Sequence, residues 1–214
     1  MSSKLLPRDA PYVPSETALL LVDMQRIWLE PGLDPDHPER GPDHYFYRQT
    51  TSITIPNNER LLAAARSNGL EVLHTIIQSL TEDGRDRSLD HKLTPIHIAP
   101  SNPAGLPPEN LGPINDEILI PKTSSGVFNS TNIDYVLKNL GVRYLIISGI
   151  MTDQCVDMAV RDAADRGYYV TCVSDACAAA SQERHDTALK AFGGYCWVAD
   201  TATVVERLST KEPA

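Results

Sequence analysis

Three side chains that could carry out a hydrolysis follow three strand-like segments of this sequence. Asp23 ends the run LLLVD, Lys122 follows EILIP, and Cys155 lies just beyond an apolar run that ends at Ile150. A thiol is a strong nucleophile as the thiolate, which a nearby ammonium group favours. A carboxylate within hydrogen-bond reach can take the thiol proton and return it to a leaving nitrogen. These residue types together indicate nucleophilic attack on a carbonyl carbon, followed by hydrolysis of a thioester.

The spacing around Cys155 places it in the first turn of a helix. Residues 145–150 form the continuous apolar run of a strand that is buried on both faces. From Val156 to Ala164 the apolar residues recur every three or four positions, and Gly167 suits the position that ends a helix. A helix start lowers the pKa of a thiol and offers backbone N–H groups to an oxyanion. We therefore expect Cys155 to be partly thiolate at neutral pH.

The elements that must position these residues alternate between strands and helices. Strand-like runs are expected at 17–23, 71–77, 117–121, 143–149, 168–175 and 195–200, and helical spacing at 57–69, 129–141, 156–166, 181–194 and 201–209. This alternation predicts an α/β fold with a doubly wound, mostly parallel sheet of about six strands, covered by helices on both faces. Because ligands of such sheets bind at the carboxyl ends of the strands, Asp23, Gln78, Lys122 and Cys155 are the residues to consider.

Length and composition favour one soluble globular domain spanning residues 1–214. The chain has 42% hydrophobic and 22% charged residues, with long loops expected at 29–56 and 78–116. The interspersed net charge of −9 argues against nucleic acid or an anionic membrane as a partner. No apolar run approaches the ~20 residues of a membrane span, and no signal peptide is evident, so a cytoplasmic location is expected. The cysteines should then be free thiols, with Cys172, Cys177 and Cys196 in the core.

Three motifs resemble those of the isochorismatase-like cysteine hydrolases, a superfamily that includes nicotinamidases, N-carbamoylsarcosine amidases and ureidoacrylate amidohydrolases. They are LLLVDMQ, PKTSSGVFNST and ISGIMTDQCV, and the resemblance runs from about residue 15 to residue 208. It implies a three-layer α/β/α fold and a catalytic triad of Cys155, Asp23 and Lys122. It also implies a cis peptide between Ile150 and Met151.

The resemblance assigns further parts of the site. The backbone amides of Met151 and Cys155 would form the oxyanion hole, and Phe128 of the lysine motif would line the pocket. Nicotinamidases carry an Asp-x-His pair and a further His that hold a metal, whereas His37, His44 and His74 here lack that spacing. We therefore expect neither a metal nor another cofactor.

Other residues are weaker candidates for substrate binding. Gln25 and Trp28 follow Asp23, and Gln78 ends a strand, where its amide could hydrogen-bond an amide or ureide. Arg85 and Arg87 could bind a substrate carboxylate, although a surface cluster of ion pairs is the simpler interpretation. Each triad residue has an ordinary alternative as well: a cysteine packed under a helix, an aspartate capping a turn and a lysine in solvent.

The sequence thus predicts a cysteine-dependent amidohydrolase that cleaves a C–N bond of a small linear amide or ureide through a thioester. One alternative is an isochorismatase-type vinyl-ether hydrolase, in which Asp23 acts as the acid; typical members of that class lack the cysteine. Another is a binding protein that has retained the fold. Long loops, together with the common oligomeric state of the superfamily, predict a homodimer or homotetramer.

Overall fold

The computed structural model describes residues 5–34, 37 and 40–209. The predicted domain limits at residues 1 and 214, and four positions of the predicted loop 29–56, lie outside the described residues. A six-stranded parallel sheet has the strand order β3-β2-β1-β4-β5-β6. Its strands are β1 (Thr17–Val22), β2 (Glu71–Ile77), β3 (Ile118–Lys122), β4 (Tyr144–Ile150), β5 (Tyr169–Ala178) and β6 (Trp197–Ala199). The predicted α/β fold is confirmed.

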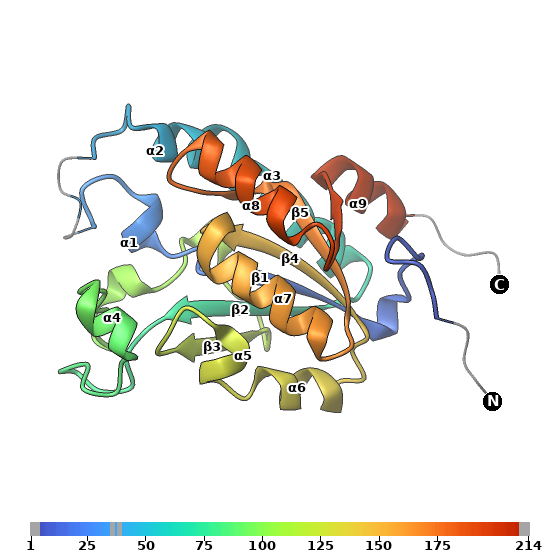
Figure 1. Ribbon diagram of the computed structural model, residues 1–214, viewed down its shortest axis with the longest axis horizontal. Coiled ribbons are helices and arrows are strands. Elements are labelled where there is room, and N and C mark those ends of the chain that lie inside the picture. The colour runs from blue at the N-terminus through green and yellow to red at the C-terminus, as the bar shows by residue number, and fades with distance from the viewer. Residues whose placement is uncertain (1–4, 35–36, 38–39, 210–214) are drawn as a thin grey trace.

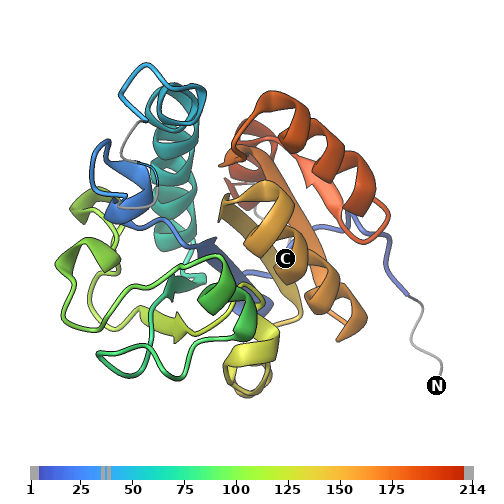
Figure 2. The ribbon, with the colours of Figure 1, turned by 60° about the vertical axis from the view of Figure 1, so that its left-hand side comes forward.

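Helices cover both faces of the sheet, as the alternating pattern predicted (Figures 1 and 2). One face packs against α5 (Val127–Ser130), α6 (Ile133–Asn139), α7 (Asp157–Asp165) and α8 (Gln182–Phe192), and the other against α2 (Tyr45–Gln49), α3 (Ile55–Ser67) and α9 (Thr201–Ser209). Strand β1 supplies both cores, since Leu20 faces the first group of helices and Leu19 and Leu21 the second. The sheet is therefore the middle one of three layers.

The two predicted loops differ in structure. The second half of 29–56 is helical, because α2 continues through the π-helical turn η2 (Thr50–Thr54) into α3. The prediction of a loop there was wrong, because the run QTTSITI of β-branched and polar residues hides the helical spacing. Segment 78–116 keeps its irregular course and contains α4 (Leu89–Leu93) and the 3-10 turns η3 (Pro103–Gly105) and η4 (Glu109–Leu111). Two shorter helical elements, η1 (Pro14–Glu16) and α1 (Arg26–Leu29), flank β1.

Two glycines hold the nucleophile segment in place. Gly149 has φ +119°, and a β-carbon on it would lie 2.1 Å from the carbonyl oxygen of Val22, so only glycine lets β4 approach β1 this closely. Gly167 has φ +93° and follows α7, as predicted. Its backbone N–H donates to Ala164 O, and the N–H of Tyr168 donates to Ala163 O, which ends the helix. The chain between them runs from the end of β4 through the turn η5 (Thr152–Val156) into α7.

Candidate active site

Three strand ends bring Asp23, Lys122 and Cys155 together. Asp23 follows β1, Lys122 is the last residue of β3, and Cys155 lies in η5, just beyond β4. The strand order reverses its direction of growth between β1 and β4, and crevices of open parallel sheets form at such points. Asp23 has φ +54°, a left-handed conformation that aspartate tolerates better than most residues.

The ammonium group of Lys122 links the other two side chains. Its Nζ lies 2.8 Å from Asp23 Oδ2 and 3.4 Å from Cys155 Sγ, and it donates a 3.0 Å hydrogen bond to Ser124 O. An ammonium has three N–H donors, and these three acceptors surround it. The hydroxyl of Thr75 on β2 donates to Asp23 Oδ1 at 2.9 Å. The carboxylate is thus held from two directions.

All three side chains are withdrawn from solvent. Lys122 is 0% exposed, Asp23 1% and Cys155 4%. Moving a single charge into such surroundings costs several kcal/mol, and a partner of opposite sign offsets that cost only at short range. The Lys122–Asp23 pair meets this condition. We refer to these three residues as the triad floor.

Burial also decides the protonation of the thiol. It raises the pKa of Cys155 to about 12, because the loss of hydration and the negative charge of Asp23 outweigh the positive charge of Lys122. The expectation that Cys155 is partly thiolate at neutral pH is therefore wrong. Burial by itself would lower the pKa of Lys122, but the charges of Asp23 and Cys155 raise it, so the ammonium stays protonated. The resting site therefore holds a protonated thiol beside the ammonium group of Lys122.

The turn that carries Cys155 has the backbone expected for it. The peptide bond between Ile150 and Met151 is cis, as predicted. The N–H groups of Gln154 and Val156 both donate to Met151 O, at 3.0 and 3.2 Å, which closes the turn around the nucleophile. Cys155 therefore stands in the first turn of the continuous helical segment η5–α7.

Two side-chain contacts fasten this turn to the start of α8. Thr152 Oγ1 lies 2.8 Å from His185 Nδ1, and both residues are buried. The next residue, Asp153, forms an ion pair with the Nε of Arg184. Two contacts thus join the nucleophile turn to the start of α8.

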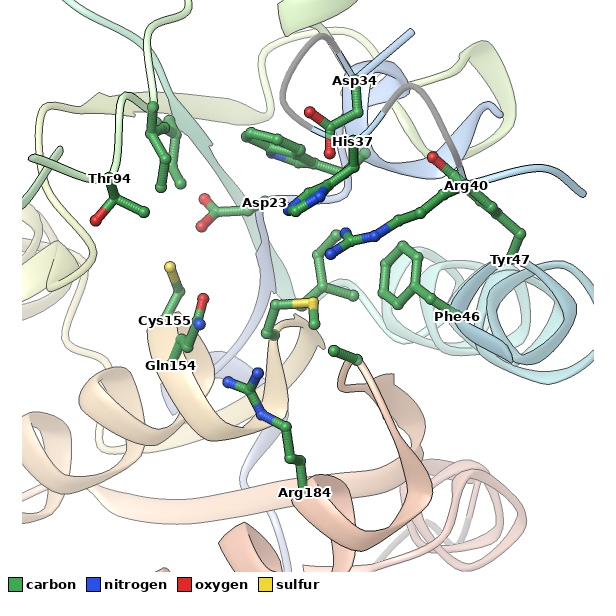
Figure 3. Close-up of a pocket in the computed structure, with 16 residues that line it drawn as sticks. Asp23, Asp34, His37, Arg40, Phe46, Tyr47, Thr94, Gln154, Cys155 and Arg184 are labelled. Atoms are coloured by element: carbon green, nitrogen blue, oxygen red, sulfur yellow. The ribbon is translucent and has the colours of Figure 1, made fainter. Parts of the chain in front are cut away.

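A pocket of about 220 Å³ opens above the triad floor. Figure 3 shows Asp23 and Cys155 at its base and Arg184 rising from α8. Its apolar lining comprises Trp28, Phe46, Ile77, Ile96, Ile150 and Met151. Its polar rim includes Asp34, His37, Arg40 and Arg184, which we call the outer wall. The pocket admits a small molecule with a polar group at each end.

Of the residues predicted to bind substrate, Trp28 lines this pocket and the other three do not. Gln25 is 0% exposed, and its side-chain amide is fully used: Nε2 donates to Ile77 O and Gly105 O, and Oε1 accepts from Ile77 N at 2.8 Å. The prediction that Gln25 binds substrate is therefore wrong. Its side chain has a structural role, because it joins β2 to segment 78–116. The side chain of Gln78 is absent from the lining, and its backbone N–H donates to Lys122 O.

Phe128 also needs correction. It is 6% exposed and packs against Tyr168, with ring centroids 6.1 Å apart, and beneath the guanidinium of Arg166. Both partners follow the end of α7, whereas Cys155 precedes its start. Phe128 therefore stabilises the far end of the nucleophile helix and does not line the pocket.

The positively charged residues of the pocket differ from those considered in the sequence. Arg85 pairs with Asp83 on the surface, and Arg87 donates to the carbonyls of Gly84, His91 and Ile96. Sequence reasoning missed Arg40 and Arg184, because neither stands at a strand end. The polar start of α8, SQERHD, with Ser181 at the capping position, was the signal available for Arg184.

The described residues contain no group of three or more His, Cys, Asp and Glu side chains arranged to hold a metal ion. His74, buried within β2, instead pairs with Glu117 at 3.2 Å, and His44 caps α2. Within the same part of the chain, no helix has the length and apolar character needed to cross a membrane.

Comparison with known proteins agrees with this geometry. The model of the isochorismatase domain family matches residues 17–203. The chain belongs to the isochorismatase family of hydrolases. It is 30% identical to the ureidoacrylate amidohydrolase RutB of Agrobacterium fabrum over 186 residues, which cover 79% of each chain. It also resembles a cysteine hydrolase from Pseudomonas syringae pv. phaseolicola, with a TM-score of 0.81 and 26% identity over 97% of this chain and 98% of the other.

A third relative shows the fold alone. The N-carbamoylsarcosine amidase of Thermoplasma acidophilum superimposes with a TM-score of 0.69 at 20% identity, covering 92% of this chain and 99% of that one. The predicted membership of the isochorismatase-like superfamily is confirmed, and this family member has the three-layer architecture of its relatives.

Proposed function

We propose that this hydrolase cleaves the C–N bond of a small linear amide or ureide with Cys155 as the nucleophile. The observation that carries the proposal is the position of Lys122 Nζ, 2.8 Å from Asp23 and 3.4 Å from Cys155, both of which line the pocket. The names of two relatives support the reaction class, since RutB is a ureidoacrylate amidohydrolase and the Pseudomonas syringae protein a cysteine hydrolase.

In the first half of the reaction, Asp23 removes the thiol proton as Cys155 Sγ attacks the carbonyl carbon. Because the raised pKa keeps the thiol protonated at rest, this transfer accompanies the attack. The backbone amides of Met151 and Cys155 receive the oxyanion of the tetrahedral intermediate. Protonated Asp23 then gives its proton to the leaving nitrogen, the C–N bond breaks, and ammonia or an amine departs.

The second half of the reaction regenerates the enzyme. Asp23 takes a proton from water, whose oxygen attacks the thioester carbon, and the C–S bond breaks with return of a proton to Sγ. Lys122 orients Asp23 through their 2.8 Å contact and stabilises negative charge on sulfur as it develops. Trp28 belongs to the apolar lining of the pocket and would pack against the apolar part of the substrate.

Ammonia release from a panel of nicotinamide, ureides, biuret and carbamoyl amino acids tests the proposal. We expect turnover of at least one compound and its loss in Cys155→Ala, with circular dichroism and melting temperature unchanged. Near-normal turnover in that variant would exclude the covalent mechanism. Hydrolysis of isochorismate that survives in Cys155→Ala and is lost in Asp23→Asn would identify the vinyl-ether reaction instead. A folded protein inactive on every compound would support a binding function.

We also propose that the protein is cytoplasmic and forms a homo-oligomer. All four cysteines are free thiols, as expected in a reducing compartment. Leu89 and Leu93, one turn apart on α4, are 72% and 74% exposed, an arrangement suited to contact with a second copy. Light scattering should give a dimer or tetramer mass, and Leu89→Asp with Leu93→Asp should reduce it. A monomer mass for the unchanged protein would contradict this assembly.

A further inference from the structure

Arg184 presents part of its guanidinium to the pocket. It stands near the start of α8, where its backbone N–H donates to the capping hydroxyl of Ser181 at 3.3 Å. Its Nε pairs with Asp153, and its side chain is 49% exposed. Among the described residues, no hydrogen bond involves its Nη1 or Nη2 atoms. Figure 3 shows this end of the side chain directed toward the space that Gln154 and Cys155 border.

The position of this guanidinium is fixed relative to the nucleophile. Asp153 is 17% exposed in its side chain and belongs to the same turn as Cys155. The neighbouring contact between Thr152 and His185 joins that turn to α8 a second time. A guanidinium held through Nε keeps its two Nη groups in one plane, so their N–H bonds run parallel toward a ligand.

We propose that Arg184 binds a carboxylate of the substrate, and that the substrate is therefore a small amide or ureide of an organic acid. This inference rests on the proposed amidohydrolase function and adds the class of substrate. Two parallel N–H donors match the two oxygens of a carboxylate, the geometry that arginine forms with such anions. The amide end lies over Cys155, and the carboxylate end meets Arg184.

The remaining lining fits a short apolar link between the two ends. Ile150 and Met151 line the pocket next to the nucleophile turn, and Trp28 and Phe46 line it as well. Arg40 also lies on the outer wall, extending from the other side of the pocket (Figure 3). It is the alternative carboxylate receptor, and the experiment must separate the two arginines.

Binding to the Cys155→Ala variant tests the inference without turnover. The probes are the ω-amic acids from oxamate to glutaramate, each compared by calorimetry with its uncharged diamide. Because hydrogen bonds to charged groups contribute about 1.5–3 kcal/mol, at least one acid should bind about tenfold or more tightly than its diamide. Adding Arg184→Gln should remove that preference, while affinity for the diamide should change little. Arg85→Gln is the matched control, since Arg85 also pairs with an aspartate but lies outside the pocket.

The outcomes that overturn this inference differ from those that overturn the proposed function. Equal binding of acids and diamides at every chain length, or a preference that survives Arg184→Gln, would exclude Arg184 as a carboxylate receptor. A preference lost in Arg40→Gln and kept in Arg184→Gln would transfer the role to Arg40. None of these results depends on catalysis. Conversely, ammonia release that persists in Cys155→Ala would exclude the thioester route and leave these affinities unaffected.

Discussion

The triad floor and the outer wall of the pocket are built in different ways. The floor residues Asp23, Lys122 and Cys155 follow three strands of one sheet, and each is at most 4% exposed. The wall residues come from the segment before α2 and from the first turns of α8, and Arg184 is half exposed. The sheet fixes the positions of the floor residues, whereas the wall residues lie on segments whose sequence can change without disturbing the sheet. Under the proposed function, the floor residues set the reaction and the wall residues set the substrate.

Beyond the loss of turnover expected in Cys155→Ala, the largest effect on turnover should come from Asp23→Asn. An amide cannot accept the thiol proton, and loss of a general acid–base group lowers kcat by about 10²–10⁴-fold. The same change should speed alkylation of Cys155 by iodoacetamide at pH 8, because removal of the Asp23 charge lowers the thiol pKa while Lys122 keeps its charge. Peptide mapping of the alkylated protein measures the second effect. Slower alkylation in this variant would contradict the electrostatic account of the floor.

The next effect is on stability and concerns Lys122→Met. This variant leaves the Asp23 carboxylate buried without its partner, and removing one member of a buried pair costs about 3–5 kcal/mol. The double variant Asp23→Asn with Lys122→Met should regain most of that loss and stay inactive. Urea unfolding of the single and double variants measures the difference. Equal stability of the two would show that Asp23 does not depend on Lys122.

The sequence was enough to predict the floor and most of the sheet. Asp23, Lys122 and Cys155 each stand at or just beyond the end of an apolar strand, and parallel strands bring their carboxyl ends to one edge. Asp23, Lys122 and Cys155 could therefore be grouped before their distances were known. Their protonation could not be predicted, because the pKa of Cys155 depends on how far burial outweighs the charge of Lys122.

The residues of the outer wall could not be predicted from the sequence, and the reason is physical. His37 and Arg40 lie in a segment with no helical or strand periodicity, so nothing in the local sequence determines where their side chains point. Gln25 and Phe128 were misassigned because nearness to a motif in the sequence says little about direction. The Gln25 amide turns to the backbone of Ile77, and Phe128 turns to the far end of α7.

Arg184→Gln should sharpen the contrast by affecting the wall alone. The Arg184–Asp153 pair is partly exposed, and ion pairs of that kind contribute at most about 1 kcal/mol to stability. The free energy of unfolding should therefore change far less than in Lys122→Met, while KM for the preferred acid rises and kcat changes little. Steady-state kinetics beside urea unfolding provide both measurements. A large loss of stability would make Arg184 part of the structural frame.

The smallest expected effect is a loss of stability at acid pH, and it concerns His185, which joins α8 to the nucleophile turn through Thr152. Burial lowers the pKa of His185 from 6.5, and the nearby charges of Asp186 and Asp153 offset this only in part. The unfolded chain therefore binds more protons than the folded one at pH values between the lowered pKa and 6.5. Where the unfolded state binds more protons, the free energy of unfolding decreases as the pH is lowered. Acidification from pH 7.5 should accordingly reduce the free energy of unfolding as the pH passes below 6.5.

The contact between His185 and Thr152 gives this pH effect a local test. A neutral ring can accept the Thr152 hydroxyl at Nδ1, whereas a protonated ring cannot, so acid should loosen the link between α8 and the nucleophile turn. His74, whose pKa burial also lowers, contributes to the same loss of stability, but it lies on β2, pairs with Glu117 and does not line the pocket. Loosening of this link by acid should also lower turnover. The variant His185→Asn keeps a polar group near the position of Nδ1 but does not titrate. It should therefore reduce both the slope of the unfolding free energy against pH and the fall in turnover at acid pH. His74→Gln should reduce the slope of the unfolding free energy against pH without altering turnover. If both variants alter turnover to the same extent, the link through Thr152 is not what acid disrupts.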